Sequence, residues 1–167
     1  MKQRENRKNN AISPKTVSET PQISRALGRL QQSKLCAAAS ALGDRILLEQ
    51  HLPATARLLG GAAEADLRQL QLIGALQRDR GAPPIMGVNL PSYGYMLLDD
   101  ADAHAPVVAR RILRQRIQER AQTVAALQAI LPQVRGEALR SLLQRIVAED
   151  EEQLAALQAM DKRLSSS

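Results

Sequence analysis

The feature that most restricts the fold of this chain is that its apolar residues are almost all aliphatic and recur at helical spacing. The 167 residues include no Phe, no Trp and only two Tyr. A core must therefore be built from Leu, Ile, Val, Ala and Met, which pack well between helices and lack the aromatic and β-branched enrichment of strands. A chain of this length normally forms one domain with a sizeable core. We expect an all-α domain.

Proline and glycine residues predict where the helices begin and end. Proline is costly inside a helix but favourable in its first turn, so Pro53 is expected to begin the second helix. The alternative is that the turn between the first and second helices lies at Gly60-Gly61, which would leave a long first helix kinked at Pro53. The predicted helices are residues 21–51 after a Thr20 cap, 53–80, from an acidic start at 99–102 to 131, and 137–162.

The segment 82–98 is dense in Pro and Gly and has no lasting hydrophobic period. It predicts a long connection between the second and third helices, whereas the other two connections are short. The expected architecture is an antiparallel four-helix bundle with one long crossover, spanning residues 21–163. Residues 1–20 are expected to form a disordered basic tail, and residues 164–167 a short C-terminal tail.

Polar residues interrupt the apolar faces of the predicted helices at related positions. The pattern D-x-x-Q-L occurs twice, as Asp66 with Gln69 and as Asp150 with Gln153. Lys34 precedes Asp66 by 32 residues on the apolar face of the first helix. Similarly, Glu119 precedes Asp150 by 31 residues, at the edge of the apolar face of the third helix. In antiparallel helix pairs these spacings place the residues at similar heights, so the sequence predicts a shared polar layer.

These motifs resemble the ligand layer of the ferritin-like superfamily, the rubrerythrin and bacterioferritin type of bundle, over about residues 21–163. In that family, two helices each supply a glutamate and two each supply Glu-x-x-His to a di-iron or di-manganese pair. By this resemblance the first glutamate matches Lys34, the third-helix glutamate matches Glu119, and the two Glu-x-x-His motifs match the D-x-x-Q pairs. The acidic run EDEEQL and the RGAPP ending of the second helix are also similar to the family.

The departures from the family pattern concern the metal ligands. Both histidines are replaced by glutamine, whose carboxamide oxygen is a weak, neutral donor. Lys34 places a cation where the family has an anionic ligand, and it can pair with Asp66, Asp150 or Glu119. We therefore expect a buried cluster of hydrogen-bonded ion pairs in place of the metal pair, with Arg116 and Arg120 as additional cations.

The formal net charge is +6, of which residues 1–20 contribute +3. Such a tail can hold phosphates without reading sequence, which leaves a nucleic-acid-associated bundle as one alternative function. The single Cys36 cannot form an internal disulfide, and it is interpreted as a small buried hydrophobe. His51 and His104 are interpreted as caps or solvated residues, and Tyr93 and Tyr95 as residues that pin the crossover.

The sequence contains no P-loop, dinucleotide-binding glycine pattern, nucleophile elbow or zinc-ligand spacing. It also has no stretch typical of a signal peptide or membrane span, so a cytoplasmic location is the default expectation. The expected function is that of a non-catalytic structural or interaction protein without a cofactor, and a homo-oligomer is one assembly consistent with that role. The alternative is a di-iron or di-manganese oxidoreductase or iron-handling protein with unusual ligands, such as Asp66, Glu119 and Asp150.

Overall fold

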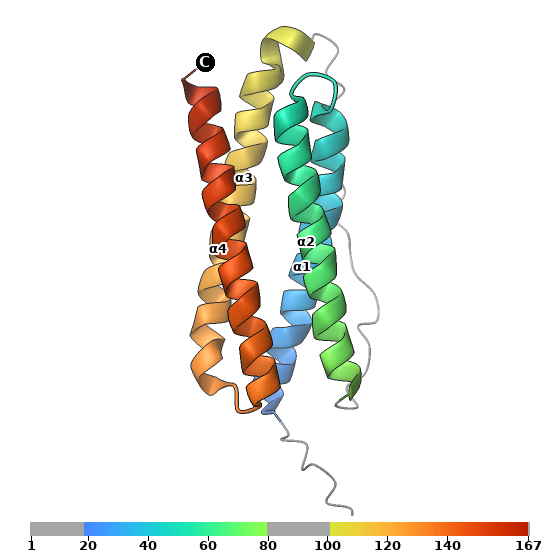
Figure 1. Ribbon diagram of the computed structural model, residues 1–167, viewed down its shortest axis with the longest axis vertical. Coiled ribbons are helices and arrows are strands. Elements are labelled where there is room, and N and C mark those ends of the chain that lie inside the picture. The colour runs from blue at the N-terminus through green and yellow to red at the C-terminus, as the bar shows by residue number, and fades with distance from the viewer. Residues whose placement is uncertain (1–18, 80–100, 167) are drawn as a thin grey trace, which may run out of the picture.

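The computed structural model describes residues 19–79 and 101–166, and over these residues it is helical without strands. Figure 1 shows long helices lying side by side along the long axis of the molecule. The helices are α1 (Pro21–Leu48), α2 (Pro53–Asp79), α3 (Ala101–Ile130) and α4 (Glu137–Ser165), with a short 3₁₀ turn, Leu131–Gln133, between the last two. The all-α prediction is confirmed. Most of the predicted basic tail and the 82–98 connection, with Tyr93 and Tyr95, lie outside the described residues.

The first connection lies at residues 49–52, directly before Pro53, which is the first residue of α2. The Leu52 amide donates to the Leu48 carbonyl at 2.8 Å and closes this turn. Gly60 and Gly61 therefore lie inside α2, so the alternative turn at these glycines is wrong. Gly60 is buried beneath Arg45: a Cβ atom on it would lie 3.0 Å from the Cδ atom of that arginine.

The bounds of α3 agree with the predicted helix, and those of α4 differ at its C-terminal end. Pro106 lies inside α3, close to its first residue. Further along the chain, α4 continues to Ser165, so the expected C-terminal tail at 164–167 begins too early. Leu164 packs against an apolar cluster, and Lys162 and Arg163 lie in the last turn, where cations are stabilised by the helix dipole.

The core consists of apolar clusters that a charged layer separates. One cluster includes Leu27, Ile73, Leu127 and Leu143, and another includes Leu48, Leu59, Leu113 and Leu157. A small alanine cluster of α1 and α2 lies on the same side of the layer as the second. Along each helix, a charged residue lies between the positions that belong to one side and those that belong to the other.

The packing between helices is uneven. α1 packs most extensively against α2, and α3 against α4, while the contacts of α1 with α3 and of α2 with α4 are sparser. None of the helices described combines the length and hydropathy that a bilayer span requires.

Candidate functional site: a buried ion-pair cluster

Each of the four helices contributes one charged side chain to a cluster at the centre of the bundle, which we call the central cluster. Its members are Lys34 of α1, Asp66 of α2, Arg120 of α3 and Asp150 of α4. The Lys34 ammonium donates to Asp66 Oδ1 at 2.9 Å and to Asp150 Oδ1 and Oδ2 at 2.7 and 2.6 Å. These hydrogen-bonded residues are far apart in sequence. The cluster therefore links α1 and α2 to α3 and α4.

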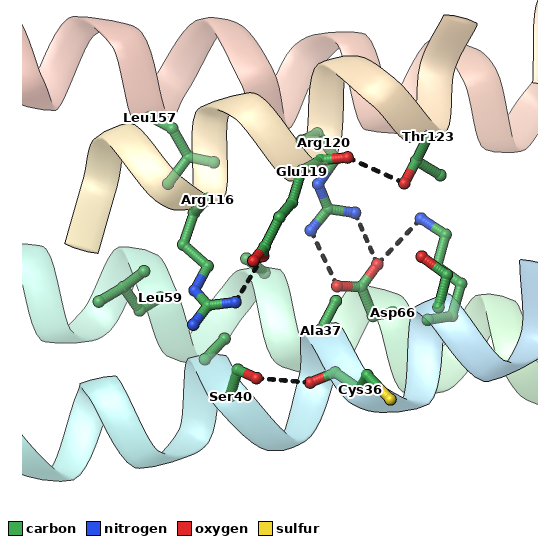
Figure 2. A pocket seen from close by; sticks show the side chains of 14 residues that line it. Cys36, Ala37, Ser40, Leu59, Asp66, Arg116, Glu119, Arg120, Thr123 and Leu157 are labelled. Carbon is green, nitrogen blue, oxygen red and sulfur yellow. Dashed lines mark hydrogen bonds and ion pairs between the residues drawn. The ribbon is translucent and has the colours of Figure 1, made fainter. Parts of the chain in front are cut away.

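Arg120 completes the central cluster from the opposite side. Its Nη1 donates to Asp66 Oδ1 at 2.6 Å and to Asp150 Oδ1 at 2.8 Å, and its Nη2 donates to Asp66 Oδ2 at 2.8 Å. The fork of the guanidinium thus binds Asp66 through two parallel hydrogen bonds, the geometry in which arginine pairs best with a carboxylate (Figure 2). All four aspartate oxygens accept at least one hydrogen bond from a cation.

The cluster is fully buried and electrically balanced. Both aspartates are 0% exposed, Lys34 is 1% exposed and Arg120 is 8% exposed. Burial disfavours the charged guanidinium, but the adjacent carboxylates outweigh this effect and raise the pKa of Arg120 above its ordinary value. Burying a charge costs several kcal/mol unless it is paired and hydrogen-bonded, and two cations with two anions meet that condition.

Glutamine side chains flank the central cluster. Gln69, one turn after Asp66, is 0% exposed and donates through Nε2 to Glu149 Oε2 at 3.0 Å. Its Oε1 atom, like those of Gln31 and Gln153, is buried and accepts no hydrogen bond from the described protein atoms. These oxygens make the surroundings of the cluster polar on more than one side.

A second charged group surrounds Arg116 on α3. Its Nε donates to Asp44 Oδ2 at 2.9 Å, and its Nη1 donates to Glu119 Oε2 at 2.6 Å. Glu119 also accepts from Gln115 Nε2 at 2.9 Å, and its side chain is 41% exposed. Burial raises the pKa of Asp44, although the Coulombic attraction of Arg116 and the hydrogen bond from it oppose that shift.

Among the residues predicted for the polar layer, the structure brings Lys34, Asp66 and Asp150 into direct contact. Gln69 and Gln153 lie one helical turn beyond the two aspartates, and Gln153 is partly buried. Glu119 differs from the expectation: it bonds to Arg116 and Gln115 near the surface, and Arg120 occupies the place expected for it.

A sequence signal for Arg120 exists in the apolar spacing of α3. Leu113, Arg120 and Leu127 are separated by seven residues each, so they share one helix face, and both leucines are buried. Glu119 lies about 100° away from that face. The aliphatic part of an arginine side chain can be buried along such a face. A classification of residues as apolar or charged does not show this.

Other chemistry-bearing residues lie away from the central cluster. His104 is exposed, His51 is partly buried beside the first turn, and Glu49 is exposed and lies 3.5 Å from Arg45. Over residues 19–79 and 101–166, no group of three or more His, Cys, Asp or Glu side chains converges as metal ligands do.

A cavity of about 170 Å³ lies beside the central cluster, between α1 and α3. Figure 2 shows Arg116, Glu119 and Arg120 projecting from α3 toward α1 and α2 around this space. Cys36, which is partly buried, and Ser40 line its α1 side.

Comparisons of the whole chain with protein-family models, with curated proteins and with solved structures found no match.

Proposed function

We propose that this protein is a ferritin-like four-helix bundle in which an ion-pair cluster has replaced the di-metal centre, and that it acts as a non-catalytic structural or interaction protein. The observation that carries the proposal is the central cluster, to which each helix contributes one charged residue at a common height. The family builds its metal pair from side chains in the same relative place, one layer of inward-facing residues on four helices.

The direction of the helices supports the ferritin-like assignment. In Figure 1, α1 rises from the lower end of the bundle and α2 returns, while α3 starts at the upper end and α4 rises again. This order makes two hairpins whose middle helices run parallel, which requires a long connection between α2 and α3. Residues 80–100 are long enough for that connection, because an extended chain spans about 3.3 Å per residue.

The residues of the cluster do not fit a di-metal centre. Its anionic groups are two aspartates, and every oxygen of both already accepts a hydrogen bond from Lys34 or Arg120. A divalent ion in the same layer would lie beside two permanent cations, whose repulsion is strong in a low-dielectric interior. The glutamines that replace the family's histidines are weak donors for first-row transition metals. The same positions thus favour charge pairing over metal binding.

Metal analysis tests the proposal. The full-length chain should be purified from cells supplemented with iron and manganese, and its metal content measured by inductively coupled plasma mass spectrometry. We expect far less than one metal ion per chain, and no acceleration of ferrous iron oxidation above buffer. Stoichiometric metal that is lost in Asp66→Ala but retained in the matched exposed variant Glu64→Ala would overturn the proposal.

A further inference from the structure

The cavity beside the central cluster adjoins a groove on the surface. This outer groove of about 640 Å³ lies between α1 and α3, and it shares Ser33, Glu119 and Thr123 with the cavity. The shared residues mark the place where the groove meets the cavity. Glu119 therefore lies between the groove and the charged interior of the bundle.

The inner end of this path presents buried guanidinium groups. Arg116 and Arg120 both line the cavity, and each is 8% exposed. The hydrogen bonds of Arg120 to the two aspartates come from Nη1 and Nη2, and Nε takes no part in them. A planar guanidinium with an N–H outside these bonds is suited to a carboxylate, which accepts hydrogen bonds through two oxygens.

Glu119 already supplies a carboxylate at the mouth of this cavity. Its Oε2 atom accepts from Arg116 Nη1 at 2.6 Å, and Figure 2 shows the side chain directed toward that guanidinium. The Glu119 side chain is nevertheless 41% exposed, so its carboxylate is near solvent, toward which it could turn. An entering carboxylate can then replace it on Arg116 with no net change of charge in the cavity.

The remaining walls of the cavity define the rest of the ligand. Lys34 and Asp66 of the central cluster line one part, together with small polar side chains, and the apolar part consists of Ala37, Ala41, Leu59, Ala62 and Leu157. For comparison, an engineered apolar cavity of about 150 Å³ in another protein binds benzene. The 170 Å³ available here is therefore sufficient for a short aliphatic chain but not for a nucleotide or a long acyl chain.

We propose that this cavity is a binding site for a small monocarboxylate with a short aliphatic body, and that Glu119 is the internal carboxylate that the ligand displaces from Arg116. A monocarboxylate fits better than a dianion, because it replaces the charge of Glu119 one for one. The guanidinium of Arg120 and the apolar walls then fix the orientation of the ligand, with its head toward α3 and its chain toward Leu59 and Leu157. This site does not depend on whether the bundle is ferritin-like.

Calorimetric titration of the folded full-length chain with sodium butyrate tests the proposal, with butyramide as the neutral isostere. For a ligand of about six non-hydrogen atoms, dissociation constants in the range of about 0.1–10 mM are reachable. We expect saturable binding of butyrate and at least tenfold weaker binding of butyramide. Glu119→Gln should bind butyrate on the order of tenfold more tightly, because the competing charge is removed. The exposed-site control Glu64→Gln should match the wild-type protein.

Arg116→Gln should lose butyrate binding, whereas the exposed-site control Arg111→Gln should retain it. If Arg116→Gln does not fold, the comparison of butyrate with butyramide and the Glu119→Gln variant still decide the question. Equal binding of butyrate and butyramide would overturn the proposal. So would butyrate affinity in Glu119→Gln no greater than in Glu64→Gln, or no binding by either protein at about 20 mM, a concentration above the expected range.

Discussion

Substitution of Lys34 by methionine is the most direct test of how the buried charges are balanced. Methionine has nearly the same length and shape as the lysine stem, so the substitution removes the ammonium while filling most of its volume. The variant leaves Asp66 and Asp150 with Arg120 alone, and the interior then holds one uncompensated negative charge. The loss of stability should therefore come from charge rather than from a void.

The magnitude follows from the contacts that remain. Breaking a buried ion pair by removing one partner typically costs about 3–5 kcal/mol. Because Arg120 still lies within 2.8 Å of both aspartates, we expect a loss of about 3 kcal/mol, the lower end of that range. In a domain of this size each kcal/mol lowers Tm by about 2–4 °C, so Tm should fall by about 6–12 °C.

Urea unfolding followed by far-UV circular dichroism at neutral pH measures the loss, and two further variants isolate its cause. Lys162→Met removes an exposed lysine from α4 and should change the free energy of unfolding by less than about 0.5 kcal/mol. The double variant Lys34→Met/Asp150→Asn leaves Arg120 opposite Asp66 alone, a neutral pair, and should recover part of the stability lost in the single variant. The reasoning is refuted if Lys34→Met is as stable as Lys162→Met. It is also refuted if the double variant is less stable than Lys34→Met alone.

Three other substitutions give separate expectations. Since burial raises the pKa of Asp44, the folded protein holds that proton more tightly than the unfolded chain, and stability should fall as pH rises from the unfolded pKa through the folded one. Asp44→Asn should flatten this part of a plot of unfolding free energy against pH, and an unchanged slope would contradict the assignment. Leu143→Ala, at a position 0% exposed, should cost about 2–5 kcal/mol in urea unfolding, and a loss below 1 kcal/mol would show that the site is not tightly packed. Thr20→Ala removes a cap whose Oγ1 accepts from the Ile23 amide at a long 3.4 Å, so its cost should be only about 0.5 kcal/mol by the same measurement, and a cost above 2 kcal/mol would indicate another role.

The helical elements were predictable because their signals are local. Pro21 and Pro53 occupy first-turn positions, where proline is favourable, and both begin helices in the structure. The end of α4 was less predictable, because Leu164 is held by packing against residues far away in the sequence. Helix boundaries that depend on tertiary contacts carry no local pattern.

The central cluster was predictable only in part. Lys34, Asp66 and Asp150 interrupt otherwise apolar faces, and this interruption indicates burial with a partner. The choice between Glu119 and Arg120 was harder, because the two residues are adjacent in sequence and Glu119 lies at the edge of the apolar face. The resemblance to a carboxylate ligand set favoured Glu119, whereas the spacing of Leu113, Arg120 and Leu127 favoured the residue that the structure places inside. The cavity beside them had no sequence signal, since a void depends on how small side chains from different helices meet.

The alternation of charge among the four helices, positive on α1 and α3 and negative on α2 and α4, also restricts how the bundle can assemble. Leucine- and alanine-rich surfaces can slide past one another by a turn, about 5.4 Å, and still bury similar apolar area. Any such slip here would move one charged side chain away from its counter-ions. The separated charges would then be buried with neither a partner nor water. The charged layer thus selects a single alignment of otherwise interchangeable aliphatic helices.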